Sequence, residues 1–96
     1  MSIRYDHQPG YITVSMPYEI TDFNTNDIIR DVETLLKKHT PSTITIDFSE
    51  TSVMNGDSYK VITAIKNTAR QYGGTVSFYN ISSSIQYYLA INNIKT

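Results

Sequence analysis

Apolar residues follow two different spacings along this chain, and the alternation between them restricts the fold more than any other feature of the sequence. In residues 11–16, Ile12 and Val14 alternate with polar neighbours, as in a strand with one buried face. In residues 24–39, apolar residues recur at the spacing of an amphipathic helix. The two patterns then follow each other to the end of the chain. The sequence therefore predicts strands connected by helices, which form parallel crossovers.

Turn and cap residues set the bounds of these elements. Pro9-Gly10 signals a turn, Pro41 ends the first helix, and Gly73-Gly74 closes the second. The predicted strands are residues 3–6, 11–16, 42–50 and 75–80, and the predicted helices are residues 24–39, 58–74 and 82–93. We expect one α/β domain over residues 1–96, with a mixed, mostly parallel β-sheet of about four to five strands covered by three helices.

Composition excludes several classes of protein. With 96 residues, 40% of them apolar, the chain can bury one modest core. The net charge of −1 gives no broad electrostatic footprint for nucleic acid. The absence of cysteine excludes disulfides and thiolate metal sites. No apolar run has the length of a membrane span or a signal peptide, so we expect a cytoplasmic protein with no membrane insertion.

Few side chains point to catalysis or metal binding. His7 and His39 lack the spacing of a metal pair, and Gly56 stands alone rather than in a glycine-rich phosphate loop. Asp47 and Asp57 resemble a pair of catalytic carboxylates, but no third group is evident that would position a substrate. We therefore predict no catalytic residue, no metal and no cofactor, and expect that the protein is not an enzyme.

The stretch "VMNGDSYKVI", residues 53–62, leaves the carboxyl end of a strand and enters a helix. In open α/β sheets ligands and partners meet this edge, and a helix N-terminus offers unpaired N–H groups. Asp57 and Ser58 both have side chains that cap helices, and the local stretch favours this purely structural role. A contact site for another macromolecule is the alternative.

The C-terminal half resembles the STAS family, the domain of bacterial anti-sigma factor antagonists. "IDFS" matches the family's strand end, "VM" matches the apolar pair before its motif, and Gly73-Gly74 matches its double glycine. "SSSIQYYLAINNI" resembles the last helix and "GYITVSMPYEI" the opening strands. This layout places Asn55-Gly56-Asp57-Ser58 on the family's Asp-Ser-Ser-Gly or Asp-Ser-Thr-Gly motif.

The motif itself departs from the family's pattern. Gly56 stands where such proteins have the hydroxyl that is phosphorylated, and glycine cannot accept a phosphoryl group. Asn55 replaces the motif's Asp, Asp57 its second hydroxyl residue and Ser58 its glycine. Either Ser58 is the phosphoacceptor in a shifted loop, or Asp57 supplies a fixed negative charge instead of a conditional one.

The resemblance implies a protein-interaction module in a partner-switching pathway. Its partner would be a serine kinase or anti-sigma factor of the histidine-kinase-like ATPase type, with a serine phosphatase as a second partner. The implied partner-binding residues are Asn55, Gly56, Asp57, Ser58, Tyr59 and Lys60. Tyr59 is equally compatible with an exposed interface anchor and with packing on the sheet edge. The alternatives are a non-switching subunit of a larger assembly, such as a transporter or a stress-signalling complex, and a small enzyme or nucleotide binder.

Overall fold

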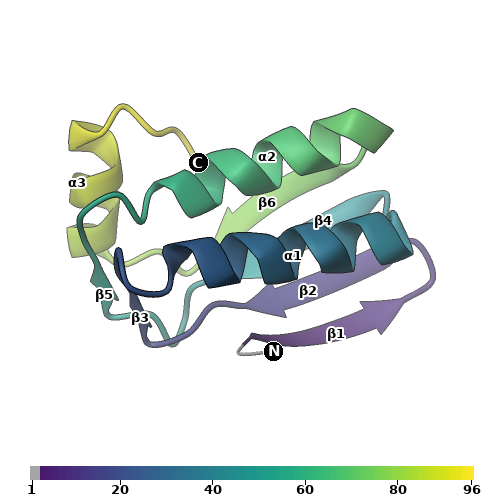
Figure 1. Ribbon diagram of the computed structural model, residues 1–96, viewed down its shortest axis with the longest axis horizontal. Helices are drawn as coiled ribbons and strands as arrows, with labels where there is room; N and C mark the ends of the chain where they lie inside the picture. The colour runs from purple at the N-terminus through teal and green to yellow at the C-terminus, as the bar shows by residue number, and fades with distance from the viewer. Residues whose placement is uncertain (1–2) are drawn as a thin grey trace.

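The computed structural model describes residues 3–96. The elements in chain order are β1 (Arg4–Gln8), β2 (Tyr11–Ser15), β3 (Glu19–Ile20), α1 (Thr25–His39), β4 (Thr43–Asp47), β5 (Val53–Met54), α2 (Lys60–Tyr72), β6 (Thr75–Tyr79) and α3 (Ser83–Ile91). Four strands form one sheet in the order β1-β2-β4-β6, in which only the β1–β2 pair is antiparallel. β3 and β5 pair in parallel as a second, small sheet. Figure 1 shows α1 and α2 side by side on one face of the large sheet, and α3 at the end where β3 and β5 lie.

The core lies between these two helices and the sheet. Ile12, Val14, Ile44 and Ile46 point toward the helices and are fully buried. The helices present the apolar stripes expected from their spacing, namely Ile28, Val32, Leu35 and Leu36 from α1 and Val61, Ile62, Ile65 and Ala69 from α2. Burying each of the larger side chains contributes about 1.5–3 kcal/mol, so this cluster is the main stabilising contribution.

The opposite face of the sheet is polar. Thr13, Thr45 and Ser77 lie in one row across β2, β4 and β6, and all three are only partly buried. Their hydroxyl groups can bond to water, so this face needs no second layer of helices. The expectation of helices over the sheet therefore holds for one face.

The predicted α/β fold with three helices and a mixed sheet is confirmed. The two-residue strands β3 and β5 were not predicted, because two residues are too short to show a period. α2 begins at Lys60 rather than at residue 58. Within residues 3–96, every helix is too short or too polar to span a lipid bilayer.

Helix ends follow local chemistry in most places. Thr40 adopts a left-handed conformation before Pro41, Gly73 does so after α2 with φ +82°, and Ser82 Oγ accepts a hydrogen bond from Ile85 N at the start of α3. The starts of α1 and α2 lack a side-chain cap. At α1 the N-cap residue, Asn24, instead accepts a hydrogen bond of 2.9 Å from Thr21 N through Oδ1.

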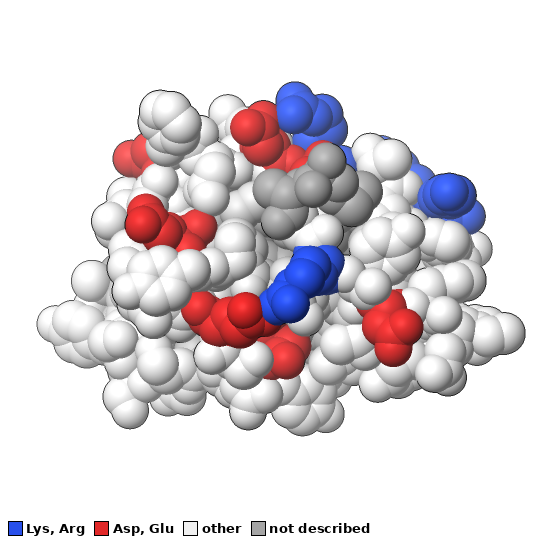
Figure 2. Space-filling model, turned by 90° about the horizontal axis from the view of Figure 1, so that it is seen from below, with Lys and Arg blue, Asp and Glu red and all other residues white. Residues whose placement is uncertain are grey.

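Both signs of charge are mixed on the surface. Figure 2 shows acidic side chains at several places on the face seen from below, with basic side chains directly beside some of them. Arg4 and Glu50 form one of the ion pairs of the described residues. The visible face therefore carries no continuous basic strip.

Two histidines meet at the edge of the sheet. His7 lies in β1, which extends past the predicted strand of residues 3–6, and its ring centroid is 3.9 Å from that of His39 at the end of α1. His39 Nε2 has no hydrogen-bond partner among residues 3–96. Desolvation, with smaller contributions from His7 and Lys38, lowers the pKa of His39 below 6.5.

We expect this contact to make the fold sensitive to mild acid. The folded state favours the neutral form of His39, so its contribution to stability is complete above pH 6.5 and is lost as pH falls through the lowered pKa. Thermal unfolding at pH 7.5 and pH 5 should show a drop in Tm for the native chain and a smaller drop for His39→Gln. Equal drops in both proteins would contradict this role.

Candidate functional site

The loop after β5 turns tightly into α2. Ser58 N donates to Asn55 O at 3.1 Å, Lys60 N to Asp57 O at 3.0 Å, and Val61 N to Ser58 O at 3.1 Å. These bonds join residues three apart, so the chain enters the helix through narrow turns. The N-cap residue is Tyr59, and no side chain caps it. Neither Asp57 nor Ser58 is therefore the side-chain cap that the local sequence favours.

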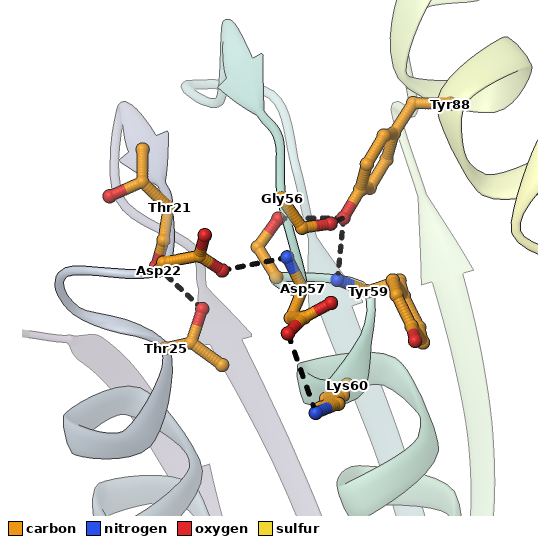
Figure 3. A network of polar contacts seen from close by, with 9 residues as sticks. Thr21, Asp22, Thr25, Gly56, Asp57, Tyr59, Lys60 and Tyr88 are labelled. Atoms are coloured by element: carbon orange, nitrogen blue, oxygen red, sulfur yellow. Dashed lines mark hydrogen bonds and ion pairs between the residues drawn. The ribbon is translucent and has the colours of Figure 1, made fainter.

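Asp22, which is distant in the sequence, supplies a side-chain hydrogen bond near the start of α2 instead. It lies between β3 and α1, and its Oδ1 accepts a hydrogen bond of 2.7 Å from Asp57 N. A carboxylate that accepts from a backbone amide near a helix N-terminus makes a charge-assisted bond. The two segments, 35 residues apart in the chain, are thereby joined (Figure 3).

This contact accounts for glycine at position 56. Gly56 has φ +59°, a conformation that costs other residues strain. A Cβ built on Gly56 would lie 2.3 Å from Asp22 Oδ2 and 2.6 Å from Oδ1. The Asp22 carboxylate therefore occupies the space into which a side chain at position 56 would project.

Tyr88 of α3 binds the loop from the other side. Its hydroxyl group donates to Gly56 O at 2.7 Å, accepts from Tyr59 N at 2.9 Å and lies 3.1 Å from Ser58 Oγ. Figure 3 shows this side chain reaching from α3 to the turn. One phenol group thus satisfies three polar groups of the loop, and α3 and the loop form one bonded unit.

The six predicted partner-binding residues divide into two groups. Asn55, Gly56, Asp57 and Lys60 are exposed. Tyr59 is half-buried and packs against the core, with its ring centroid 6.5 Å from that of Tyr88, so packing describes it better than a free anchor. Ser58 is 0% exposed.

The burial of Ser58 bears on the candidate phosphoacceptor. Its hydroxyl group is directed to the Tyr88 hydroxyl and does not reach the surface. A kinase needs an accessible hydroxyl group, so phosphorylation would require this network to open first. The arrangement gives no support to Ser58 as the acceptor.

The exposed part of the loop continues into the start of α1. A shallow hollow between the two helix starts is lined by Asp22, Thr25, Asn26, Asp57 and Lys60. Asp57 Oδ2 is 3.6 Å from Lys60 Nζ, but both side chains are more than half exposed, so this pair is weak. Phe23, next to Asp22, is 97% exposed. We call the surface formed by residues 22–26 and 55–60 the loop surface.

Sequence reasoning missed the N-terminal part of the loop surface. Asp22 and Phe23 precede a helix, where Asp is common as a cap, and nothing nearby in the sequence links them to Gly56. The only indication was the unusual glycine at the motif, which signals a close approach of another group.

Asp47 connects the end of β4 to two neighbouring segments. Its carboxylate accepts from Asn80 Nδ2 at 3.0 Å, from Ser49 N at 2.9 Å and from Ser49 Oγ at 3.1 Å. The bonds from Asn80 and then Ser49 lower the pKa of Asp47. Asp57 binds none of these groups, so the two carboxylates have separate partners. Among residues 3–96, no three His, Cys, Asp or Glu side chains gather as a metal site would require.

A family profile described as the STAS domain matches residues 2–94 of the chain. The chain belongs to the STAS family. The resemblance seen in the C-terminal half of the sequence is thereby confirmed over nearly the whole chain, and the element order agrees with it.

Solved structures extend the STAS comparison to the fold. The anti-sigma factor antagonist SpoIIAA in its unphosphorylated form matches with a TM-score of 0.73 and 12% identity over 94% of this chain and 83% of its own. The Bacillus cell fate determinant SpoIIAA in the phosphorylated form matches with a TM-score of 0.74 and 12% identity, over 97% of this chain and 85% of its own. A chain of Mglu matches with a TM-score of 0.69 and 8% identity, over 83% of this chain and 20% of its own. No curated protein sequence matches this STAS chain significantly.

Proposed function

We propose that this STAS domain is a protein-interaction module of the anti-sigma factor antagonist type. Its partner is a serine kinase or anti-sigma factor of the histidine-kinase-like ATPase type, and its contact is the loop surface. The similarity to SpoIIAA supports the kind of protein. The loop surface is supported as the contact by its exposed side chains, Asn55, Asp57 and Lys60. Phe23 beside them is almost fully exposed, and aromatic side chains of this kind anchor interfaces.

The observation that carries the regulatory part of the proposal is the contact of Asp22 with Gly56. The Asp22 carboxylate lies where a side chain at position 56 would project, and a second acidic residue, Asp57, follows Gly56 in the sequence. The negative charge at this loop is therefore permanent, while a phosphorylated loop carries about −1.5 to −2 charges only when modified.

A loop whose charge is permanent also favours the second candidate function, that of a non-switching subunit of a larger assembly. A subunit of a larger assembly needs no switch, and Gly56 together with the buried Ser58 leaves the loop without an accessible acceptor at those two positions. Purification of the native complex distinguishes the two functions. Fixed stoichiometry that does not change with ATP or phosphatase treatment indicates an assembly subunit, and ATP-dependent release indicates a switch.

Charge reversal at Asp57 tests the loop surface. We expect Asp57→Lys to weaken binding to the ATPase-type kinase encoded nearest to this gene by at least about tenfold, since the change places a cation in a partly desolvated contact. Isothermal titration calorimetry measures the affinity. The matched control is Asp6→Lys, which makes the same charge change on exposed β1, away from the loop. Equal affinities for the native chain and Asp57→Lys would exclude the loop as the contact.

Incubation with the same kinase and ATP tests the absence of a switch. We expect no added phosphate in the intact mass of the native chain, because position 56 has no hydroxyl group and Ser58 is buried. A mass increase of one phosphate that disappears in Ser58→Ala would restore Ser58 as the acceptor.

We further propose that the protein acts in the cytoplasm without a cofactor and is not an enzyme. A serine phosphatase is a partner only if the phosphate test is positive. A thermal-shift screen with nucleotides and divalent ions checks the absence of a cofactor. A rise in Tm with any of them would contradict it, because a tightly bound ligand raises Tm by mass action.

A further inference from the structure

β6 is an edge strand with an open side. It pairs only with β4 among the described strands, and its sequence Thr-Val-Ser-Phe-Tyr has no charge and no proline. Edge strands without such protection accept another strand readily. The opposite edge, β1, differs because it carries Arg4, Asp6 and His7.

The open side of β6 is set by the direction of its peptide groups. Thr75 N donates to Ser42 O, and Tyr79 O accepts from Phe48 N, so these residues face β4. Peptide groups alternate in direction along a strand. The N–H and C=O groups of Val76 and Phe78 therefore face away from the sheet and are free to pair.

The core side of β6 is also incompletely covered. Val76 and Phe78 are aligned with Ile44 and Ile46, yet they are only half-buried while their neighbours are fully buried. In Figure 1, β6 lies behind α2 at the edge of the sheet. An added strand would cover the exposed flank of Val76 and Phe78.

A basic depression runs along α2 beside this strand. Two adjoining hollows share Lys66 and Arg70, and they extend from Gly74 and Val76 to the C-terminal segment with Lys95. Of the residues that the structure describes, three cationic ones and no Asp or Glu line these hollows. Lys66 Nζ also lies 5.8 Å from the centroid of the Phe78 ring, which places its charge over β6.

We propose that an extended acidic segment of a partner protein adds to β6 as a further strand of the sheet. Backbone bonds to Val76 and Phe78 provide the pairing, and carboxylates on one face of the segment meet Lys66 and Arg70. A second copy of this chain does not fit, because pairing β6 with β6 would bring the Lys66 and Arg70 side chains of both copies together. This surface is separate from the loop surface and does not depend on its function.

Two short labelled peptides test the proposal. One alternates valine with glutamate, and the other alternates valine with lysine. Fluorescence anisotropy should show binding of the glutamate peptide only, and amide shifts of the native chain in nitrogen-15 NMR spectra should be largest at Val76 and Phe78. Equal binding of both peptides, binding of neither, or shifts confined to the loop surface would refute the proposal.

Three variants sharpen the test. Val76→Pro removes an N–H donor that faces the open edge and leaves every bond to β4 intact. We therefore expect it to weaken binding of the glutamate peptide by at least about tenfold, with an unchanged circular dichroism spectrum. Val76→Thr, which keeps the N–H group, should bind as the native chain does. Arg70→Glu, on the surface of α2, should weaken binding roughly fivefold, as an exposed ion pair is worth up to about 1 kcal/mol. Unchanged binding in both Val76→Pro and Arg70→Glu, or a dimer of the free chain in sedimentation, would contradict the assignment.

Discussion

Replacing Gly56 by alanine is expected to lower the free energy of unfolding by about 2 kcal/mol. About 1 kcal/mol is the cost of placing a residue with a Cβ at φ +59°. The remainder arises because the new methyl group would displace the Asp22 carboxylate and so break its bond to Asp57 N.

A double-mutant cycle separates the two contributions. In an Asp22→Ala background, Gly56→Ala should cost only about 1 kcal/mol, because no carboxylate remains to be displaced. Urea unfolding followed by circular dichroism measures all four proteins. Additive effects of the two substitutions would show that Asp22 does not restrict position 56.

Tyr88→Phe is expected to destabilise the protein by about 2–3 kcal/mol and to loosen the loop. The substitution keeps the ring and removes only the hydroxyl group, which leaves Gly56 O, Tyr59 N and the buried Ser58 hydroxyl without that partner. Unsatisfied buried polar groups cost about 1–3 kcal/mol each.

Tyr87 offers the matched control for this prediction. It precedes Tyr88 in α3 but is 70% exposed, so Tyr87→Phe should leave stability unchanged. Hydrogen exchange should then show faster exchange of the Tyr59 amide in Tyr88→Phe than in the control. If the two variants have the same stability and the same exchange rate, the hydroxyl network does not hold the loop.

Most of the large elements follow from local sequence. The stripe of Ile28, Val32, Leu35 and Leu36 defines α1, and the alternation around Ile12 and Val14 defines β2, because each pattern repeats several times within its element. The cap of α3 by Ser82 is equally local, since serine commonly caps helices and the bond joins residues three apart.

The candidate site was predictable only in part. The position of the loop followed from its place between strand and helix, and the importance of Gly56 from its departure from the family motif. The partners of the loop could not be predicted, because Asp57 meets Asp22 across 35 residues and Gly56 meets Tyr88 across 32. Those contacts arise when β3 pairs with β5 and α3 packs beside them, and no local pattern encodes that meeting.

The Tyr88 contact has a kinetic consequence for any molecule that docks on the loop surface. Bonds from both Asp22 and Tyr88 order the loop before an encounter, so docking requires little loss of backbone entropy. Association should therefore proceed without a slow rearrangement step, and differences in affinity between partners should appear chiefly in their residence times.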